Sequence, residues 1–390
     1  MKLIFGFLVL ILAKSYGRTL PSLSKSLSAE PPCSSNASAA WVDVVLLIDN
    51  SINMGASNLN KAKTVINSVF SKFPLGNNDN IKQGVHNTRV GIVTYNYEAS
   101  IVAQFTDINN KNDLSRVLDD DCPNGFRPVA FVIFAASSYP SINNEIPALV
   151  SQSELFDFDV LTLITVNLNN ADHTLTSILN KITYNSIIQT SMYNFSIDSN
   201  TISDDLEWAL LQANCFCMYN TGITSILYDP SKNRYARYGE CATFVSYQGF
   251  AYDNIIDMCK YVPGSRVSFE SPGYILSKEK EFLVKNLALT DPSILPFYIG
   301  YHKNSSSNWV WYDVDLSESA GSGYSNWAPG YPQNNNMMNC TVINSSDSVT
   351  FNWKNVPCDP QYSKVSNILC QNYVCDAEHT ECIKYYMGLT

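Results

Sequence analysis

The sequence predicts two folded halves, and the first of them belongs to the α/β class. A chain of 390 residues exceeds one ordinary domain, and its 45% of hydrophobic residues is enough for more than one core. An apolar strand at 42–48 leads into a polar loop and then a helix, which is the start of an α/β unit. Eight of the eleven cysteines lie between Cys217 and Cys382, which predicts a second half held together by disulfides.

The N-terminus predicts secretion. Lys2 precedes an apolar run at 3–13, and small residues suited to a signal peptidase follow at 15–17. This run is too short for the ~20 residues that cross a bilayer, so we expect a cleaved signal peptide at 1–17 rather than a membrane anchor. Residues 18–40 are rich in Ser, Pro and Ala and lack periodicity, which is typical of a linker.

The α/β half is expected over residues 41–212. Its first strand is apolar and β-branched apart from Asp43, as in a strand buried on both faces of a sheet. Apolar residues at helical spacing then predict a helix over 59–73. The run at 129–136 has the size of a core strand or a core helix. Further elements follow by the same criteria: strands at 89–95, 100–105 and 160–166, and helices at 113–118, 176–182 and 204–213.

The second half begins at residue 238, after a junction at 213–237. Helices at 252–261 and 277–287 precede a short strand at 297–301. A long stretch with little periodicity follows, and in a compact domain such a stretch either counts against the assignment of elements or marks a functional loop. The half is expected to end at residue 372, before a tail at 373–390.

Composition argues against one class of function, and the absence of motifs argues against another. Lys and Arg number 25 against 35 Asp and Glu, and the resulting net charge of -10 repels a phosphate backbone, so nucleic-acid binding is not expected. Catalysis is not expected either, because no histidine lies in a hydrolase or metalloprotease motif. The four histidines are scattered at His86, His173, His302 and His379.

Cysteines and glycosylation signals agree with an oxidising compartment. The absence of a CxxC pair argues against a zinc ribbon or a thioredoxin-like site. An odd number of cysteines leaves at least one thiol free or joined to another chain, which allows a disulfide-linked dimer. Five sequons match the N-x-[ST] rule in polar surroundings: Asn36, Asn194, Asn304, Asn339 and Asn344.

The first half resembles the von Willebrand factor A domain family. The resemblance rests on the strand that ends in Asp49-x-Ser51-x-Asn53 and on the strand at 89–95. It implies a doubly wound α/β fold. In that family an Asp-x-Ser-x-Ser loop, a Thr from a second loop and an Asp from a third hold a divalent cation through hard oxygen ligands.

The metal ligands that this resemblance implies are incomplete here. Asn53 replaces the last Ser, Val166 stands where the third-loop Asp is expected, and the segment 121–128 offers no matching Thr. Asp49, Ser51 and Asn53 therefore form at most a weak or degenerate magnesium site. The alternative is that Asp49 and Ser51 cap the first helix, and a working adhesion site is the third interpretation.

The second half resembles the C-type lectin-like domain family over residues 238–372. The motifs occur in the family's order: Ile299-Gly300, Trp309-x-Trp311, Asn326-Trp327-x-x-Gly330-x-Pro332 and four cysteines. The resemblance implies an α+β fold and three disulfides: Cys259 with Cys370, Cys340 with Cys358, and Cys217 with Cys241. Pairing stays open for Cys33, Cys122, Cys215, Cys375 and Cys382, although the last two are close enough in sequence to form a terminal loop.

The calcium ligands of that family are absent. Sugar-binding members hold Ca²⁺ with a Glu/Gln-Pro-Asn/Asp triplet, a Glu before the third cysteine and an Asn-Asp pair. The matching positions carry Gln333, Met338, Lys354 and Asn355, with no carboxylate among them. A Lys354 ammonium ~4 Å from a divalent ion would repel it by roughly 8 kcal/mol at an effective dielectric near 20. We therefore expect no calcium at this site and no other cofactor.

An aromatic and amide-rich loop remains as the candidate ligand face. Aromatic rings stack on sugars and amides bond hydroxyl groups. The candidate ligand-binding residues are Tyr331, Gln333, Asn334, Asn335 and Asn355. Trp309, Trp311, Trp327 and Trp353 are expected to lie in the core instead.

Together the two halves resemble the secreted C-type lectin family expanded in nematodes. The resemblance implies a secreted, non-catalytic protein that recognises extracellular glycans or proteins, often in innate defence. Two alternatives stay open: a calcium-dependent lectin with an atypical site, and a structural extracellular component.

Overall fold

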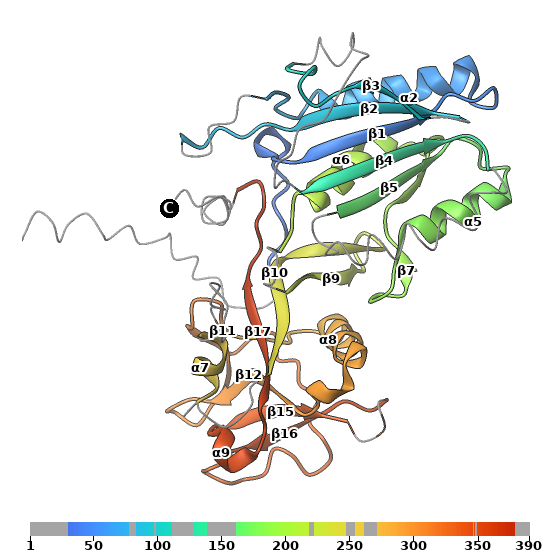
Figure 1. The fold of residues 1–390 in the computed structure, drawn as a ribbon. Coiled ribbons are helices and arrows are strands. Elements are labelled where there is room, and N and C mark those ends of the chain that lie inside the picture. Colours follow the sequence, from blue (N-terminus) through green and yellow to red (C-terminus); the bar gives the residue numbers. More distant parts are fainter. Residues whose placement is uncertain are drawn as a thin grey trace, which may run out of the picture.

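The computed structural model describes residues 30–77, 83–96, 99–110, 128–138, 161–217, 222–246, 254–260, 271–345, 347 and 349–378. Its strands form two main sheets, one in each half of the chain (Figure 1). The expected signal peptide, the helix expected at 113–118, Cys122, His379 and Cys382 lie outside the described residues. Within them, no helix is long and apolar enough to cross a membrane.

A six-stranded sheet forms the first half, in the order β3-β2-β1-β4-β5-β8. Only the edge strand β3 is antiparallel to its neighbour, and the other pairs are parallel. This arrangement confirms the predicted doubly wound α/β class. The strands are β1 (Asp43–Asp49), β2 (Arg89–Tyr95), β3 (Ala99–Ala103), β4 (Val129–Ala135), β5 (Leu161–Asn167) and β8 (Asn194–Ser196).

Helices pack on both faces of this sheet because successive residues of a strand point to opposite sides. Phe134 of β4 lies in the core shared with α2 (Gly55–Phe70) and α6 (Ile202–Ala213). Its neighbour Ile133 packs against α5 (His173–Ile182) instead. A two-stranded hairpin follows α5 and consists of β6 (Tyr184–Asn185) and β7 (Thr190–Ser191).

A mixed sheet of nine strands forms the second half, and its long path runs β14-β13-β12-β17-β10-β9. Strand β11 pairs with β17, and β15 pairs with β12 and with β16. The α+β class is confirmed. The strands are β9 (Ile223–Asp229), β10 (Arg234–Ser246), β11 (Ser271–Pro272), β12 (Phe297–Lys303), β13 (Trp309–Tyr312), β14 (Glu318–Ser319), β15 (Cys340–Asn344), β16 (Asn352–Val356) and β17 (Asn367–Tyr373).

The helices of this half are α7 (Ile255–Lys260), α8 (Lys278–Thr290) and α9 (Pro360–Ser363). Ser277 caps α8 by accepting a hydrogen bond from the Lys280 N–H. Trp311 and Trp353 are fully buried in the core beneath α8. The other two predicted core tryptophans, Trp309 and Trp327, are only partly buried.

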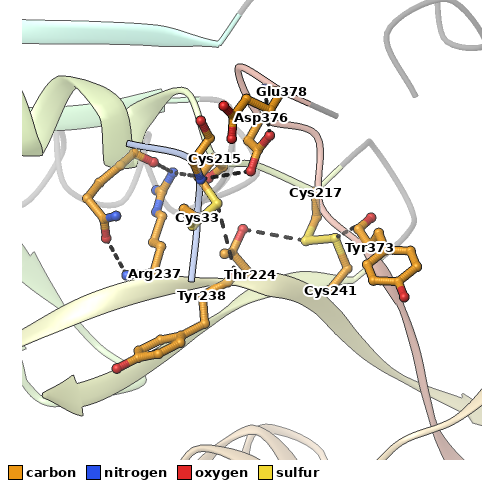
Figure 2. The surroundings of a disulfide bond; sticks show 12 residues. Cys33, Cys215, Cys217, Thr224, Arg237, Tyr238, Cys241, Tyr373, Asp376 and Glu378 are labelled. Carbon is orange, nitrogen blue, oxygen red and sulfur yellow. Dashed lines mark hydrogen bonds between the residues drawn. A yellow bond between two sulfur atoms is a disulfide. The ribbon is translucent and has the colours of Figure 1, made fainter. Parts of the chain in front are cut away.

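Four disulfides join described residues, and three of them are the pairs that the lectin resemblance implies. The fourth joins Cys33 to Cys215, so it connects the two ends of the α/β half. Figure 2 shows this bond close to Cys217–Cys241, beside Tyr238 and Asp376. Cys375 is disulfide-bonded as well.

The segment that joins the halves is structured. The predicted junction at 213–237 contains β9 and the start of β10. The described part of the predicted linker packs on the same region, where Pro32 bridges to Tyr238. From β10, Arg234 lies over the Trp208 ring at 3.7 Å and forms an ion pair with Asp205 at 2.8 Å. These contacts hold α6 of the first half against the sheet of the second.

Candidate functional site

The first candidate site lies at the carboxyl end of β1, where Asp49 is almost fully buried. One oxygen, Oδ1, accepts a hydrogen bond from the Ser51 N–H at 2.8 Å. The other, Oδ2, accepts from the Ala136 N–H at 3.0 Å and from the Ser137 hydroxyl at 3.4 Å. Both carboxylate oxygens therefore accept hydrogen bonds that join the loop after β1 to the loop after β4.

Two expectations for this loop need correction. Helix α2 has Met54 as its N-cap residue with no side-chain cap bond, so Asp49 and Ser51 do not cap it. The turn at Ser51–Met54 intervenes, and Asp49 points across to β4. The loop that faces Asp49 follows β4 rather than β5, because β4 is the direct neighbour of β1. Val166, on β5, was therefore the wrong position for a third-loop ligand.

These residues do not fit a divalent cation. Asp49 is a single carboxylate whose oxygens are already paired with N–H and O–H donors. Ser51 and Ser137 place their hydroxyl oxygens 3.5 Å apart, and Asn53 is exposed. Mg²⁺ needs near-octahedral oxygen ligation, which this set does not supply. The described residues contain no group of three or more His, Cys, Asp or Glu that could hold a metal ion.

The second candidate site is the loop at 331–339 in the lectin-like half. Asn355 on β16 lies beneath it and is 1% exposed. Its Oδ1 accepts from the Gln333 N–H at 2.7 Å, and its Nδ2 donates to the carbonyls of Gln333 at 2.9 Å and Met338 at 3.0 Å. The side-chain amide of Asn355 thus accepts one hydrogen bond from the loop and donates two to it, so Asn355 holds the loop in place.

The other predicted ligand residues lie on the outside of the same loop. Gln333, Asn334 and Asn335 are exposed, and Tyr331 is partly exposed. The Lys354 ammonium lies 5.7 Å from the centre of the Tyr331 ring, within range of a cation–π contact. Met337 adds an apolar side chain that is 73% exposed. The structure thus brings four of the five predicted residues together on one surface and places Asn355 below it.

A second anchor, Glu281 of α8, was not predicted from the sequence. Its carboxylate accepts from the Trp353 indole N–H at 2.8 Å, from the Asn326 amide at 3.1 Å and from the Tyr324 hydroxyl. Burial, and then the hydrogen bond to Glu281, raise the pKa of Tyr324 well above its usual value. One side chain therefore ties α8 to both the start of the long loop and the core strand β16.

The calcium-site positions do not suit a hard cation. The side-chain oxygen of Asn355 already accepts the Gln333 N–H, the Met338 side chain has no hard oxygen, and the Met338 carbonyl accepts from Asn355 Nδ2. Lys354 places a positive charge beside Tyr331. With no carboxylate at these positions, the set does not fit Ca²⁺.

The described histidines lie at separate places in the two halves. His302 is buried, stacks on Tyr312 with ring centres 3.7 Å apart and lies 3.3 Å from a Glu318 oxygen. His173 begins α5 and His86 lies before β2, both in the other half.

Comparisons with known proteins agree with both halves. The von Willebrand factor type A domain family matches residues 43–124. The C-type lectin domain-containing protein 160 of Caenorhabditis elegans is 22% identical over 397 residues, which cover 89% of this chain and 55% of that protein. The chain thus spans about half the length of this curated relative.

Two solved structures are similar to parts of this chain. Proximal thread matrix protein 1 from the mussel byssus, with a zinc-occupied MIDAS motif, is 14% identical with a TM-score of 0.34, covering 45% of this chain and 47% of its own. A lectin C-type domain derived from a hypothetical protein of C. elegans is 18% identical with a TM-score of 0.23, covering 32% of this chain and 81% of its own.

Proposed function

We propose that this chain, a von Willebrand factor A-like domain followed by a C-type lectin-like domain, is a secreted recognition protein that binds glycans or extracellular proteins without calcium. The disulfides support an oxidising compartment. Innate defence is the role that the resemblance to the nematode lectin family implies, and this role belongs to the proposal.

The observation that carries the proposal is the loop at 331–339. Its exposed amides at Gln333, Asn334 and Asn335 present donors and acceptors suited to hydroxyl groups or to a peptide backbone. Its underside is fixed by Asn355 through three hydrogen bonds. A loop held by the protein's own side chains needs no metal to order it, and binding then costs less conformational entropy.

A glycan array tests the proposal, run first in calcium and then in EDTA. We expect the same glycans to bind with equal affinity in both. Gln333→Ala with Asn334→Ala should weaken binding by roughly 30-fold, from two lost hydrogen bonds of about 1 kcal/mol each. Asn308→Ala is the matched control because Asn308 is an exposed amide on the β12–β13 turn, and it should leave binding unchanged.

The outcomes separate the candidate functions. Binding that EDTA abolishes would favour an atypical calcium-dependent lectin. Absence of glycan binding, together with capture of an extracellular protein that the double variant loses, would favour a protein ligand. Met337 supports that second candidate, because an exposed methionine amid amides suits an adaptable protein interface. Binding of neither kind would leave a structural role.

A further inference from the structure

One of the five sequons stands at the edge of the candidate ligand loop. Asn339 is the last residue before β15, and its Nδ2 donates to the Asn336 carbonyl at 2.9 Å. Its own carbonyl accepts from the Lys303 N–H at 2.7 Å, so its backbone is fixed at the end of β12. The Asn339 side chain is only partly buried, whereas Cys340 beside it is buried and bonded to Cys358.

The third residue of this sequon has a hydroxyl that the fold does not use. Thr341 is 0% exposed in the middle of the sheet, between Asn355 of β16 and Ile299 of β12. Its Oγ1 is buried and has no hydrogen-bond partner among the described residues. Burying an unpaired hydroxyl is unfavourable, and a valine of the same shape would avoid this penalty. Packing therefore gives no reason for a threonine here, whereas an N-glycosylation sequon requires a hydroxyl at this position.

We propose that Asn339 carries an N-linked glycan and that this glycan shields one side of the exposed surface that residues 333–336 form on the loop at 331–339. The shielding part of the proposal rests on the proposed function, since the glycan would limit access of ligands to the same loop. The modification itself stands on Asn339 and Thr341 alone.

The chemistry needs a lipid-linked oligosaccharide pyrophosphate as donor. A bond forms between Nδ2 of Asn339 and the first sugar's anomeric carbon, and the bond from that carbon to the pyrophosphate oxygen breaks. The leaving lipid pyrophosphate takes the electron pair of that bond and, through solvent, the proton that Nδ2 loses. The second amide hydrogen remains on Nδ2 as a hydrogen-bond donor. Because Thr341 is inaccessible in the folded sheet, transfer precedes the pairing of β15 with β12 and β16.

The position of the sugar follows from the local hydrogen bonds. The Met338 N–H donates to the Asn335 carbonyl at 3.1 Å, and the Asn335 N–H donates to the Gln333 carbonyl at 2.9 Å. These bonds fold the loop into a compact turn that ends at Asn339. A bulky glycan on Nδ2 therefore starts beside Asn336 and extends over the amides next to it.

The test uses the full chain secreted from eukaryotic cells. Glycopeptide mass spectrometry measures occupancy of Asn339 in the wild type and in Thr341→Val, which keeps Asn339 but destroys its sequon. Asn344→Gln is the matched control, because it removes the sequon at the other end of β15. Hydroxyl-radical footprinting then reports the exposure of Met337 and Tyr331 without any ligand.

We expect a glycan on Asn339 that Thr341→Val removes and Asn344→Gln leaves in place. Oxidation of Met337 should rise about twofold in Thr341→Val and stay unchanged in Asn344→Gln, because the glycan is bulky and local. Thr341→Val should also melt about 2–4 °C higher than Asn339→Gln, since both lack the glycan but only the former loses the buried hydroxyl. An unmodified Asn339 in the secreted protein would overturn the proposal, and so would an oxidation rate that does not change when the glycan is removed.

Failure of the proposed function gives a different pattern. If neither the wild type nor Thr341→Val binds any glycan on the array, while the glycan and its footprint are found, the loop lacks the proposed sugar-binding role but the modification stands. If Thr341→Val binds array glycans more tightly than the wild type, both the function and the shielding are supported.

Discussion

Replacing Glu281 tests whether a carboxylate on α8 holds the ligand loop in position. Three donors lose the Glu281 carboxylate in Glu281→Ala: the Trp353 indole N–H, the Tyr324 hydroxyl and the Asn326 amide, which keeps its bond to the Phe351 carbonyl. Trp353 is 0% exposed, so its N–H cannot turn to water. Asn326 and Tyr324 are only partly buried and can regain water as a partner.

The magnitude follows from this difference in burial. A hydrogen bond to a charged group is worth about 1.5–3 kcal/mol, and the Trp353 bond should contribute close to 2 kcal/mol. The two partly exposed donors should add about 0.5 kcal/mol each. We therefore expect Glu281→Ala to lower the free energy of unfolding by about 3 kcal/mol. Glu281→Gln keeps one acceptor oxygen and should lose about half of that.

Urea denaturation followed by tryptophan fluorescence measures this loss. Glu279→Gln is the matched control, since Glu279 is also in the first turn of α8 but is exposed. It removes the same favourable interaction with the helix dipole, and its effect should stay within about 0.5 kcal/mol. The reasoning is refuted if Glu281→Ala is no more destabilising than Glu279→Gln.

Three further predictions concern groups in and between the two halves. Lys280 is 0% exposed and donates hydrogen bonds to Glu240 and Ser225. Lys280→Met should lower the free energy of unfolding, measured in urea, by about 3–5 kcal/mol, because it leaves the buried Glu240 carboxylate without a cation. Adding Glu240→Leu to the same chain should restore most of this free energy. Burial raises the pKa of Tyr298 to about 12, so the stabilisation by its neutral form is fully present below pH ~10 and is lost as the pH rises to ~12. Over this range the free energy of unfolding of the wild type should fall relative to that of Tyr298→Phe by at most about 1.4 kcal/mol per pH unit. A difference between the two proteins that stays constant with pH would contradict this. The Cys33–Cys215 bond spans 182 residues, so its replacement by two serines should cost about 5 kcal/mol in the chain-entropy model, and thermal unfolding unchanged by the replacement would refute that contribution.

Much of the fold could be predicted because its signals are local. The apolar run at 42–48 corresponds to β1, and the helical spacing at 277–287 corresponds to α8. The strands at 89–95 and 100–105 pair as the expected hairpin, because their short connection favours antiparallel neighbours. The run at 129–136 could not be assigned from periodicity alone, and it forms the central strand β4.

The features that were missed depend on contacts between distant residues. Strand β9 lies in a segment that was predicted as a junction, and it becomes regular by pairing with β10. Cys33 and Cys215 meet only because the two ends of the α/β half lie together. The loop facing Asp49 could not be identified either, because the neighbour of β1 is set by sheet order rather than by sequence order.

In the candidate ligand loop, too, features with a local sequence signal could be predicted and features that depend on distant contacts could not. Its exposed residues were identified from composition and from the lectin resemblance. The roles of Asn355 and Glu281 were not, because a single Asn on a strand or a single Glu on a helix has no distinguishing pattern. Their importance comes from the hydrogen-bond donors and acceptors that surround them at 2.7–3.1 Å in the folded chain.

Calorimetric titration of calcium into the secreted protein tests most directly whether the loop is ordered by side chains alone. We predict no saturable heat at millimolar Ca²⁺, and the same hydrogen-exchange protection of residues 331–339 in calcium and in EDTA. Saturable binding that Gln333→Ala abolishes, accompanied by loss of that protection in EDTA, would show that a metal ion and not Asn355 holds the loop.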